Sequence, residues 1–120
     1  MFNFEKLETW KKTIVFADKV YAATAKFPQS ERFGLTGQMR RAAVSISSNI
    51  AEGSSRSSRT DFARFVEIAA GSLFEVVSQL VIARNQGFLD EMDYHQLYAL
   101  AEELVRMLSG LRKSLHESPT

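Results

Sequence analysis

The sequence predicts an all-α protein, folded as an up-down-up-down four-helix bundle. Apolar residues recur every three or four positions along four stretches of the chain, which is the spacing of one helix face. A proline or a glycine follows each of the first three stretches, and the connections between them are short, which favours antiparallel neighbours. We find no alternation of apolar and polar residues between turns, the pattern of a half-buried strand.

The length and composition predict one folded domain that covers residues 1–120. Hydrophobic residues make up 45% of the chain, with two prolines and six glycines, and a chain of this size can bury a real core. The absence of cysteine excludes disulfides, thiolate zinc sites and cysteine nucleophiles. The first residues do not resemble a signal peptide, and no apolar run approaches the ~20 residues that span a bilayer. We therefore expect a cytoplasmic protein with no membrane partner.

The net charge of +1 does not by itself drive the chain onto nucleic acid, but the charges are unevenly distributed. Between residues 32 and 64, six arginines stand against Glu52 and Asp61. Between residues 90 and 103 there are five acids and no lysine or arginine. Such polarity either steers an anionic partner to one end, lets copies of the protein pair opposite charges, or forms two solvated surfaces.

The first helix is expected over about residues 7–26 and is ended by Pro28. Its predicted buried face consists of Leu7, Trp10, Ile14, Ala17, Tyr21 and Thr24. Trp10 and Tyr21 are compatible with a ligand-stacking pair, but their helical spacing favours a place in the core.

The second helix is expected over about residues 35–52, with Gly53 as the left-handed residue that closes it. One arc of this helix is apolar. A neighbouring arc carries small and polar side chains that are unusual on a solvated helix face. Since such groups suit a close helix contact in which each finds a hydrogen-bond partner, we interpret the arc as a semi-buried polar seam. The polar seam consists of Gln38, Arg41, Ser45, Asn49 and Glu52.

The third helix is expected over about residues 59–86, after Ser58 as its N-cap. Besides its main apolar face it has a second apolar stripe, which either contacts another subunit or packs broadly within the bundle. From this stripe we predict Ala70, Phe74 and Val81 as oligomer contacts.

Gly87 and Asp90 precede a fourth helix over about residues 91–116, and residues 118–120 are expected to fray. The buried face of the fourth helix is predicted as Tyr94, Leu97, Ala101, Leu104, Leu108, Leu111 and Leu115.

The sequence lacks the arrangements that catalysis or metal binding needs, so we expect a non-enzymatic protein without a metal or cofactor. Di-iron bundles use Glu-x-x-His pairs, and neither His95 nor His116 follows a glutamate at that spacing. No serine lies in a nucleophile elbow, and no phosphate-binding glycine motif is present.

Binding of an anion has more support. Arg56 and Arg59 lie beside the predicted start of the third helix, where free N–H groups favour an anion, and Arg40 is expected to point outward. The alternative is that the loop serines serve as caps and the arginines project into water. Arg41 is either a further phosphate contact or a structural residue that pairs with Glu52 or with a carboxylate of a neighbouring helix.

Several motifs resemble those of the bacterial four-helix bundle proteins encoded in 23S rRNA intervening sequences. They are Gln38-Met39-Arg40-Arg41-Ala42, Ser45-Ile46, Asn49-Ile50-Ala51-Glu52-Gly53 and Ala69-x-Gly71-Ser72-Leu73-x-Glu75. The resemblance implies a small helical bundle assembled as a ring-like homopentamer. It implies little about activity, since the family lacks an established biochemical function. The accessory variability proteins of diversity-generating retroelements, which resemble this family, bind nucleic acid but are strongly basic.

Two hypotheses follow. The first is a homo-oligomeric module that binds RNA or DNA as an accessory protein, with Arg40, Arg41, Arg56 and Arg59 as phosphate contacts; a ring of copies would repeat these contacts. The second is a purely structural or protein-binding oligomer with Phe74 and Val81 at subunit contacts. An arrangement that gathers the arginines on one face would favour the first hypothesis.

Overall fold

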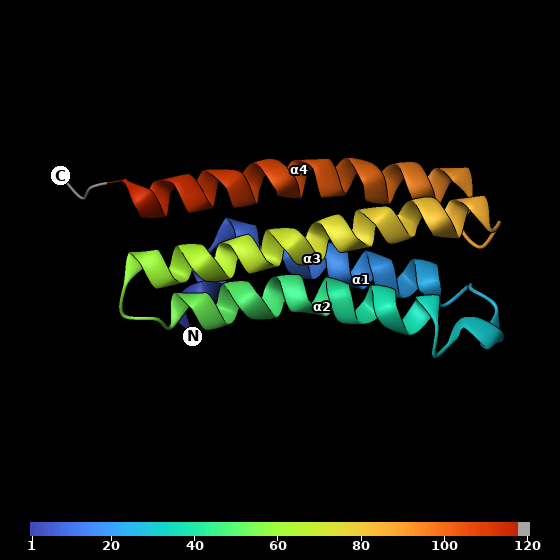
Figure 1. The fold of residues 1–120 in the computed structure, drawn as a ribbon, viewed down its shortest axis with the longest axis horizontal. Helices are drawn as coiled ribbons and strands as arrows, with labels where there is room; N and C mark the ends of the chain where they lie inside the picture. Colours follow the sequence, from blue (N-terminus) through green and yellow to red (C-terminus); the bar gives the residue numbers. More distant parts are fainter. Residues whose placement is uncertain (118–120) are drawn as a thin grey trace.

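Four α-helices form the body of the protein (Figure 1). The computed structural model describes residues 1–117, and within this range it contains no strand. The helices are α1 (Glu8–Thr24), α2 (Leu35–Ser54), α3 (Arg59–Asn85) and α4 (Glu91–His116), with short 3-10 turns at η1 (Asn3–Lys6) and η2 (Gln29–Glu31). Consecutive helices run in opposite directions along a bundle that measures 51 × 22 × 22 Å. The all-α prediction is confirmed. The predicted fraying of residues 118–120 lies outside the described residues.

The local signals that begin and end α3 and α4 are the ones predicted. Ser58 accepts a hydrogen bond from the Asp61 N–H at 3.0 Å, and Asp90 accepts one from the Asp93 N–H at 2.7 Å, so both side chains are N-caps. Gly87 follows α3 with a φ of +78°, which a residue with a side chain rarely adopts. These three residues explain why α3 begins and ends, and α4 begins, close to the predicted bounds.

Gly53 has a different role from the predicted one. It lies inside α2 and is buried, and Gly87 is the only glycine between residues 1 and 117 with a positive φ. A Cβ atom on Gly53 would lie 2.6 Å from the Phe65 Cβ and 2.9 Å from the Phe62 Cδ1. The glycine therefore serves the close approach of α2 and α3, not the end of a helix, because only hydrogen fits between the two backbones.

The buried face of α1 is rotated from the predicted face. Phe16 and Val20 are fully buried, whereas Tyr21 is 44% exposed. The apolar residues of α1 extend around more than half of the helix, so their spacing alone did not distinguish the inner side. On α4 the prediction was correct, since Leu97, Leu104 and the other members of its face pack in the core or against it.

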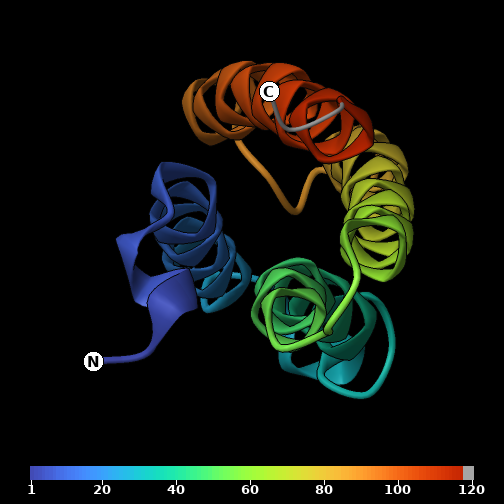
Figure 2. The same ribbon diagram turned by 90° about the vertical axis from the view of Figure 1, so that its left-hand side faces the viewer.

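Helix α3 lies between α2 and α4, as the end-on view shows (Figure 2). Its buried side carries Val66, Leu73 and Leu80, all at most 1% exposed. In the described chain it is the one helix whose length and composition would suffice to cross a membrane, with a mean hydropathy of 1.7 in its most apolar window. Only 33% of that window is buried. The most apolar helix thus keeps a large apolar outer surface.

Candidate functional site

The three arginines predicted to bind an anion all make contacts within the chain. Arg59 is the first residue of α3, and its guanidinium donates hydrogen bonds to the carbonyl oxygens of Ser114 and Leu115 at the end of α4, the second at 3.3 Å. Carbonyls in the last turn of a helix lack partners within the helix and attract cations. Arg59 therefore acts as a cap that joins α4 to the beginning of α3.

Arg56 lies in the α2–α3 connection and bends back over the bundle. Its Nη2 atom lies 3.1 Å from the Glu52 Oε1, and its Cζ lies 4.7 Å from the centre of the Phe65 ring. Both members of the ion pair are about half exposed, so the pair adds little to stability. Glu52 is thus a partner of Arg56, and among the described residues no ion pair joins it to Arg41, for which it was one of the alternatives.

Arg40 does not point outward as predicted. Its Nε donates to the Thr24 hydroxyl at 2.9 Å, its Nη2 donates to the Tyr21 carbonyl at 3.3 Å, and its Cζ lies 4.5 Å from the centre of the Tyr21 ring. The exposed face of Tyr21 explains this position, since a guanidinium packs well on an aromatic ring. Arg40 therefore holds the end of α1 against α2.

The predicted arginines do not gather on one face. Arg40 lies near the beginning of α2, whereas Arg56 and Arg59 lie beyond its end, and the helix from Arg40 to Ser54 alone spans about 21 Å. Arg41 is exposed on another side of α2. These four arginines therefore do not form one cationic face on a single copy, which is the arrangement that would have favoured nucleic-acid binding.

The polar seam exists only in its middle part. Asn49 Nδ2 donates to the Ser45 carbonyl at 2.8 Å and to the Ser45 Oγ at 3.0 Å, and Ser72 Oγ of α3 donates to the Ser45 Oγ at 3.0 Å. Ser45 and Asn49 are half-buried, whereas Gln38, Arg41 and Glu52 are exposed. The exposed members of the predicted seam lie towards the two ends of α2, so only its middle part is enclosed by the contact with α3.

Two further polar residues of α3 were missed from the sequence. Gln79 is only 6% exposed, and its Nε2 donates to the Glu75 Oε2 at 3.2 Å. The Oε1 atom of Gln79 is buried and accepts no hydrogen bond from the described residues. Gln79 lies at helical spacing with the buried Val76 and Ala83, so its position on α3 is the only signal of its burial, and its polar side chain points the other way.

A groove between α3 and α4 contains two of the three predicted oligomer contacts. It measures about 520 Å³ and is lined mainly by small and apolar side chains, with the Glu67–Arg112 ion pair (2.6 Å) at one end. Ala70 and Phe74 line it, and Phe74 is 59% exposed. Val81 is half-buried against the core and lies further along α3. Ile68 and Ile82, each 48% exposed, extend the apolar outer surface of α3 and were not predicted.

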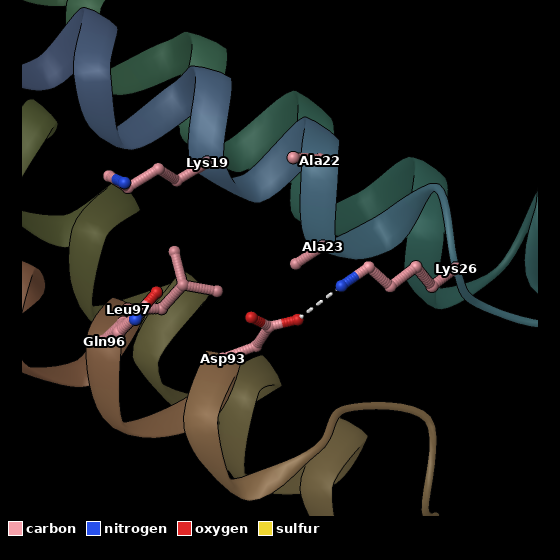
Figure 3. Close-up of a pocket in the computed structure, with 7 residues that line it drawn as sticks. All are labelled: Lys19, Ala22, Ala23, Lys26, Asp93, Gln96 and Leu97. Carbon is pink, nitrogen blue, oxygen red and sulfur yellow. Dashed lines mark hydrogen bonds and ion pairs between the residues drawn. The ribbon is translucent and has the colours of Figure 1, made fainter.

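A smaller hollow of about 130 Å³ lies between α1 and α4 (Figure 3). Lys19 of α1 and Lys26, which lies just after the end of α1, line it, and Asp93 of α4 pairs with Lys26 at 3.0 Å. The hydrogen bond from Lys26 to Asp93, and the attraction between their charges, raise the pKa of Lys26 above its ordinary value. A second pair, Lys12–Glu103 at 3.3 Å, joins the same two helices. The hollow therefore lies at the contact between α1 and α4, with ion pairs at its sides.

The described residues offer no arrangement for metal chemistry. No group of three or more histidine, aspartate or glutamate side chains within residues 1–117 is placed to hold a metal ion. His95 pairs with Glu91 at 3.2 Å on the surface of α4, and both side chains are 69% exposed. Two exposed groups one helical turn apart form a surface pair and do not make a metal site.

A family model described as "23S rRNA-intervening sequence protein" matches residues 5–110 of the chain. The chain belongs to this family. The resemblance deduced from the α2 and α3 motifs is therefore confirmed. A search of curated proteins found no significant match.

Members of this fold are also known among solved structures. A crystal structure of a protein of unknown function from the S23 ribosomal protein family of Bacteroides thetaiotaomicron superimposes with a TM-score of 0.78. Its sequence is 22% identical, and the match covers 88% of this chain and 98% of that protein. At this identity the likeness shows the fold alone. Neither the family description nor this structure indicates a catalytic activity.

Within the family motifs, the structure separates residues with different roles. Ser45 and Asn49 make the α2–α3 hydrogen bonds, Gly53 allows the close approach of the two helices, and Ser72 is the α3 partner of Ser45. Arg40 binds α1. In this member of the family, the motif residues thus mainly hold the helices together.

Proposed function

We propose that this chain is a non-enzymatic, cytoplasmic module of bacteria whose function is to assemble with copies of itself. The observation that carries the proposal is the outer surface of α3. Ile68, Phe74 and Ile82 are between 48% and 59% exposed along this helix, which has the highest apolar content of the bundle. Single exposed apolar residues are ordinary, but Phe74 lines an apolar groove towards α4, and Ile68 and Ile82 leave further apolar surface on the same helix, which is typical of a contact surface.

The chemistry of the other candidate sites supports a contact protein over an enzyme. Arg40, Arg59, the Ser45–Ser72 hydrogen bond and the Lys26–Asp93 pair contribute to helix packing, and none of them forms a nucleophile–base pair or a metal centre among the described residues. The resemblance to family members that form ring-like homopentamers suggests five copies, which is the finer form of the proposal.

Light scattering at micromolar concentrations tests this proposal. We expect a molar mass several times the 13.5 kDa of one chain. A single-chain mass over the whole concentration range would show that the module does not assemble, and a five-copy mass would support the ring.

Nucleic-acid binding is a second candidate function, and one observation favours it. Arg56 and Arg59 lie at the same end of the bundle and remain exposed despite their contacts. A ring would repeat both cations in every copy. The test is a binding titration with ribosomal RNA and DNA at several salt concentrations. If Arg40→Glu, Arg56→Glu and Arg59→Glu together leave the affinity at low salt unchanged, or if no binding occurs, this function is excluded.

A further inference from the structure

The connection from α1 to α2 borders a polar hollow that is separate from the outer surface of α3. The hollow measures about 550 Å³ and lies between the end of α1 and the beginning of α2, at one end of the bundle (Figure 1). Arg32 and Arg40 line it, together with the side chains of Thr24, Gln29 and Thr36. Among the described residues no carboxylate lines this hollow. Its lining is therefore cationic and rich in hydrogen-bond donors.

Neither of the two arginines has an acidic partner. Within residues 1–117 no ion pair reaches Arg32 or Arg40. Glu31, the acid of the same connection, accepts a hydrogen bond from the Leu35 N–H at 3.3 Å and lines a different hollow. Because two cations that line one hollow repel each other, their charges favour an anionic ligand between them.

Arg40 is held in a fixed orientation at the wall of the hollow. Its Nε donates to the Thr24 hydroxyl at 2.9 Å, and its Nη2 donates to the Tyr21 carbonyl at 3.3 Å. Neither bond uses the Nη1 group, and a guanidinium has more N–H donors than these two bonds occupy. A side chain that is already oriented loses less conformational freedom when a ligand binds to it.

Thr36 is an independent indication of a ligand. This residue of the first turn of α2 is only 7% exposed, and it lines the hollow. Its hydroxyl makes no hydrogen bond with any described residue, although hydroxyl groups in buried positions normally have a partner. The first turn of α2 also carries no acid of its own, so its N–H groups favour an anion at the same place.

From these observations we infer that the hollow is a binding site for a phosphate group. A phosphate monoester carries several acceptor oxygens and about two negative charges at neutral pH. Arg32 and Arg40 donate to these oxygens and balance their charge, and the Thr36 hydroxyl gains the partner that it lacks within the chain. A single copy contains every side chain of the site, so the inference is independent of the proposed self-assembly.

The first test is isothermal titration calorimetry of the full chain with inorganic phosphate, at constant ionic strength so that general charge screening does not change. Arg32→Gln removes one cation, and Thr36→Val removes the hydroxyl while nearly keeping the shape of the side chain. Arg106→Gln is the matched control, because Arg106 is exposed on α4 and makes no ion pair with any described residue. Arg40 is left unchanged, since it also holds α1 against α2.

We expect Arg32→Gln to weaken phosphate binding about tenfold and Thr36→Val about threefold, and Arg106→Gln to leave it unchanged. Circular dichroism checks that the variants remain folded. If millimolar phosphate gives no heat of binding, or if Arg32→Gln and Arg106→Gln weaken it equally, the site is wrong.

A competition experiment identifies the source of the phosphate group. Short single-stranded RNA that binds the wild type, binds Arg32→Gln more weakly and is displaced by inorganic phosphate would assign the hollow to the phosphates of a polymer. Binding of inorganic phosphate and of a nucleoside monophosphate, without binding of RNA, would assign it to a small phosphorylated molecule. A single-chain mass in light scattering would contradict the proposed assembly but not this site.

Discussion

Gly53 is the residue on which the contact between α2 and α3 depends most directly. Its missing side chain lets the two helices approach until the Phe65 Cβ would lie 2.6 Å from an added methyl group. The Phe65 Cβ is attached directly to the backbone, so it cannot move away as the end of a flexible side chain would.

We predict that Gly53→Ala destabilises the protein by about 1–3 kcal/mol, because the added methyl group forces α2 and α3 apart. Urea denaturation gives the free energy of unfolding. Gly110→Ala is the matched control, since Gly110 also lies in a helix but an added Cβ there has no atom within 4 Å. That change should raise stability by roughly 0.5–1 kcal/mol. Equal effects of the two changes would show that close packing at Gly53 is unimportant.

Between helices, Ser45 is the shared acceptor of the α2–α3 contact. Its Oγ receives hydrogen bonds from Asn49 and Ser72, each at 3.0 Å. We predict that Ser45→Ala costs about 1 kcal/mol of stability, because in a half-buried site Ser72 loses its acceptor and Asn49 keeps only the Ser45 carbonyl. A double-mutant cycle with Ser72→Ala measures the interaction between helices. A coupling energy near zero would mean that water replaces the serine–serine bond.

The contact between α1 and α4 depends on pH through Lys26. Since Asp93 raises the pKa of Lys26, the protonated lysine stabilises the folded state, and this contribution is complete below the unfolded pKa of ~10.4. It is lost as the pH rises through the higher folded value.

We therefore predict that wild type exceeds Lys26→Met in stability at pH 7 and that this difference is lost as the pH rises through the raised pKa of Lys26. Denaturation at a series of pH values measures the difference. Lys6→Met serves as control, because Lys6 is exposed and makes no ion pair with any described residue. A difference that persists unchanged into strongly alkaline solution would contradict the assigned role of Lys26.

For the whole molecule, self-assembly links stability to concentration. If folded copies bind one another and unfolded chains do not, the melting temperature rises with protein concentration. We predict this rise for the wild type and a smaller one for Phe74→Ser, which exchanges a ring that is 59% exposed in a single copy. Calorimetry over a hundredfold range of concentration is the measurement. A melting temperature independent of concentration would argue against assembly.

The helices were predictable from sequence because their signals are local. Ser58, Asp90 and Gly87 act within one helical turn, and the regular spacing of the α4 apolar face leaves one buried side. The inner face of α1 was not predictable, since its apolar residues surround much of the helix and only the positions of α2 and α4 select Phe16 over Tyr21.

The candidate site was less predictable, because side-chain partners come from distant parts of the chain. Arg59 binds carbonyls more than fifty residues away, and Arg40 binds residues of α1. The local sequence shows which cations lie near a helix end, but it does not show which groups those cations contact. The family could be predicted from the motifs, because they contain residues that make contacts between helices, such as Ser45 and Ser72.

The buried Oε1 of Gln79 has a consequence for how this fold can change. A buried acceptor without a donor lowers stability, and among the described residues the one hydrogen bond of this side chain goes to an exposed glutamate, Glu75. Methionine has nearly the same length and no such unmet acceptor. Replacing Gln79 by methionine would therefore raise the stability of the fold. The chain could then tolerate destabilising new residues on its outer surfaces.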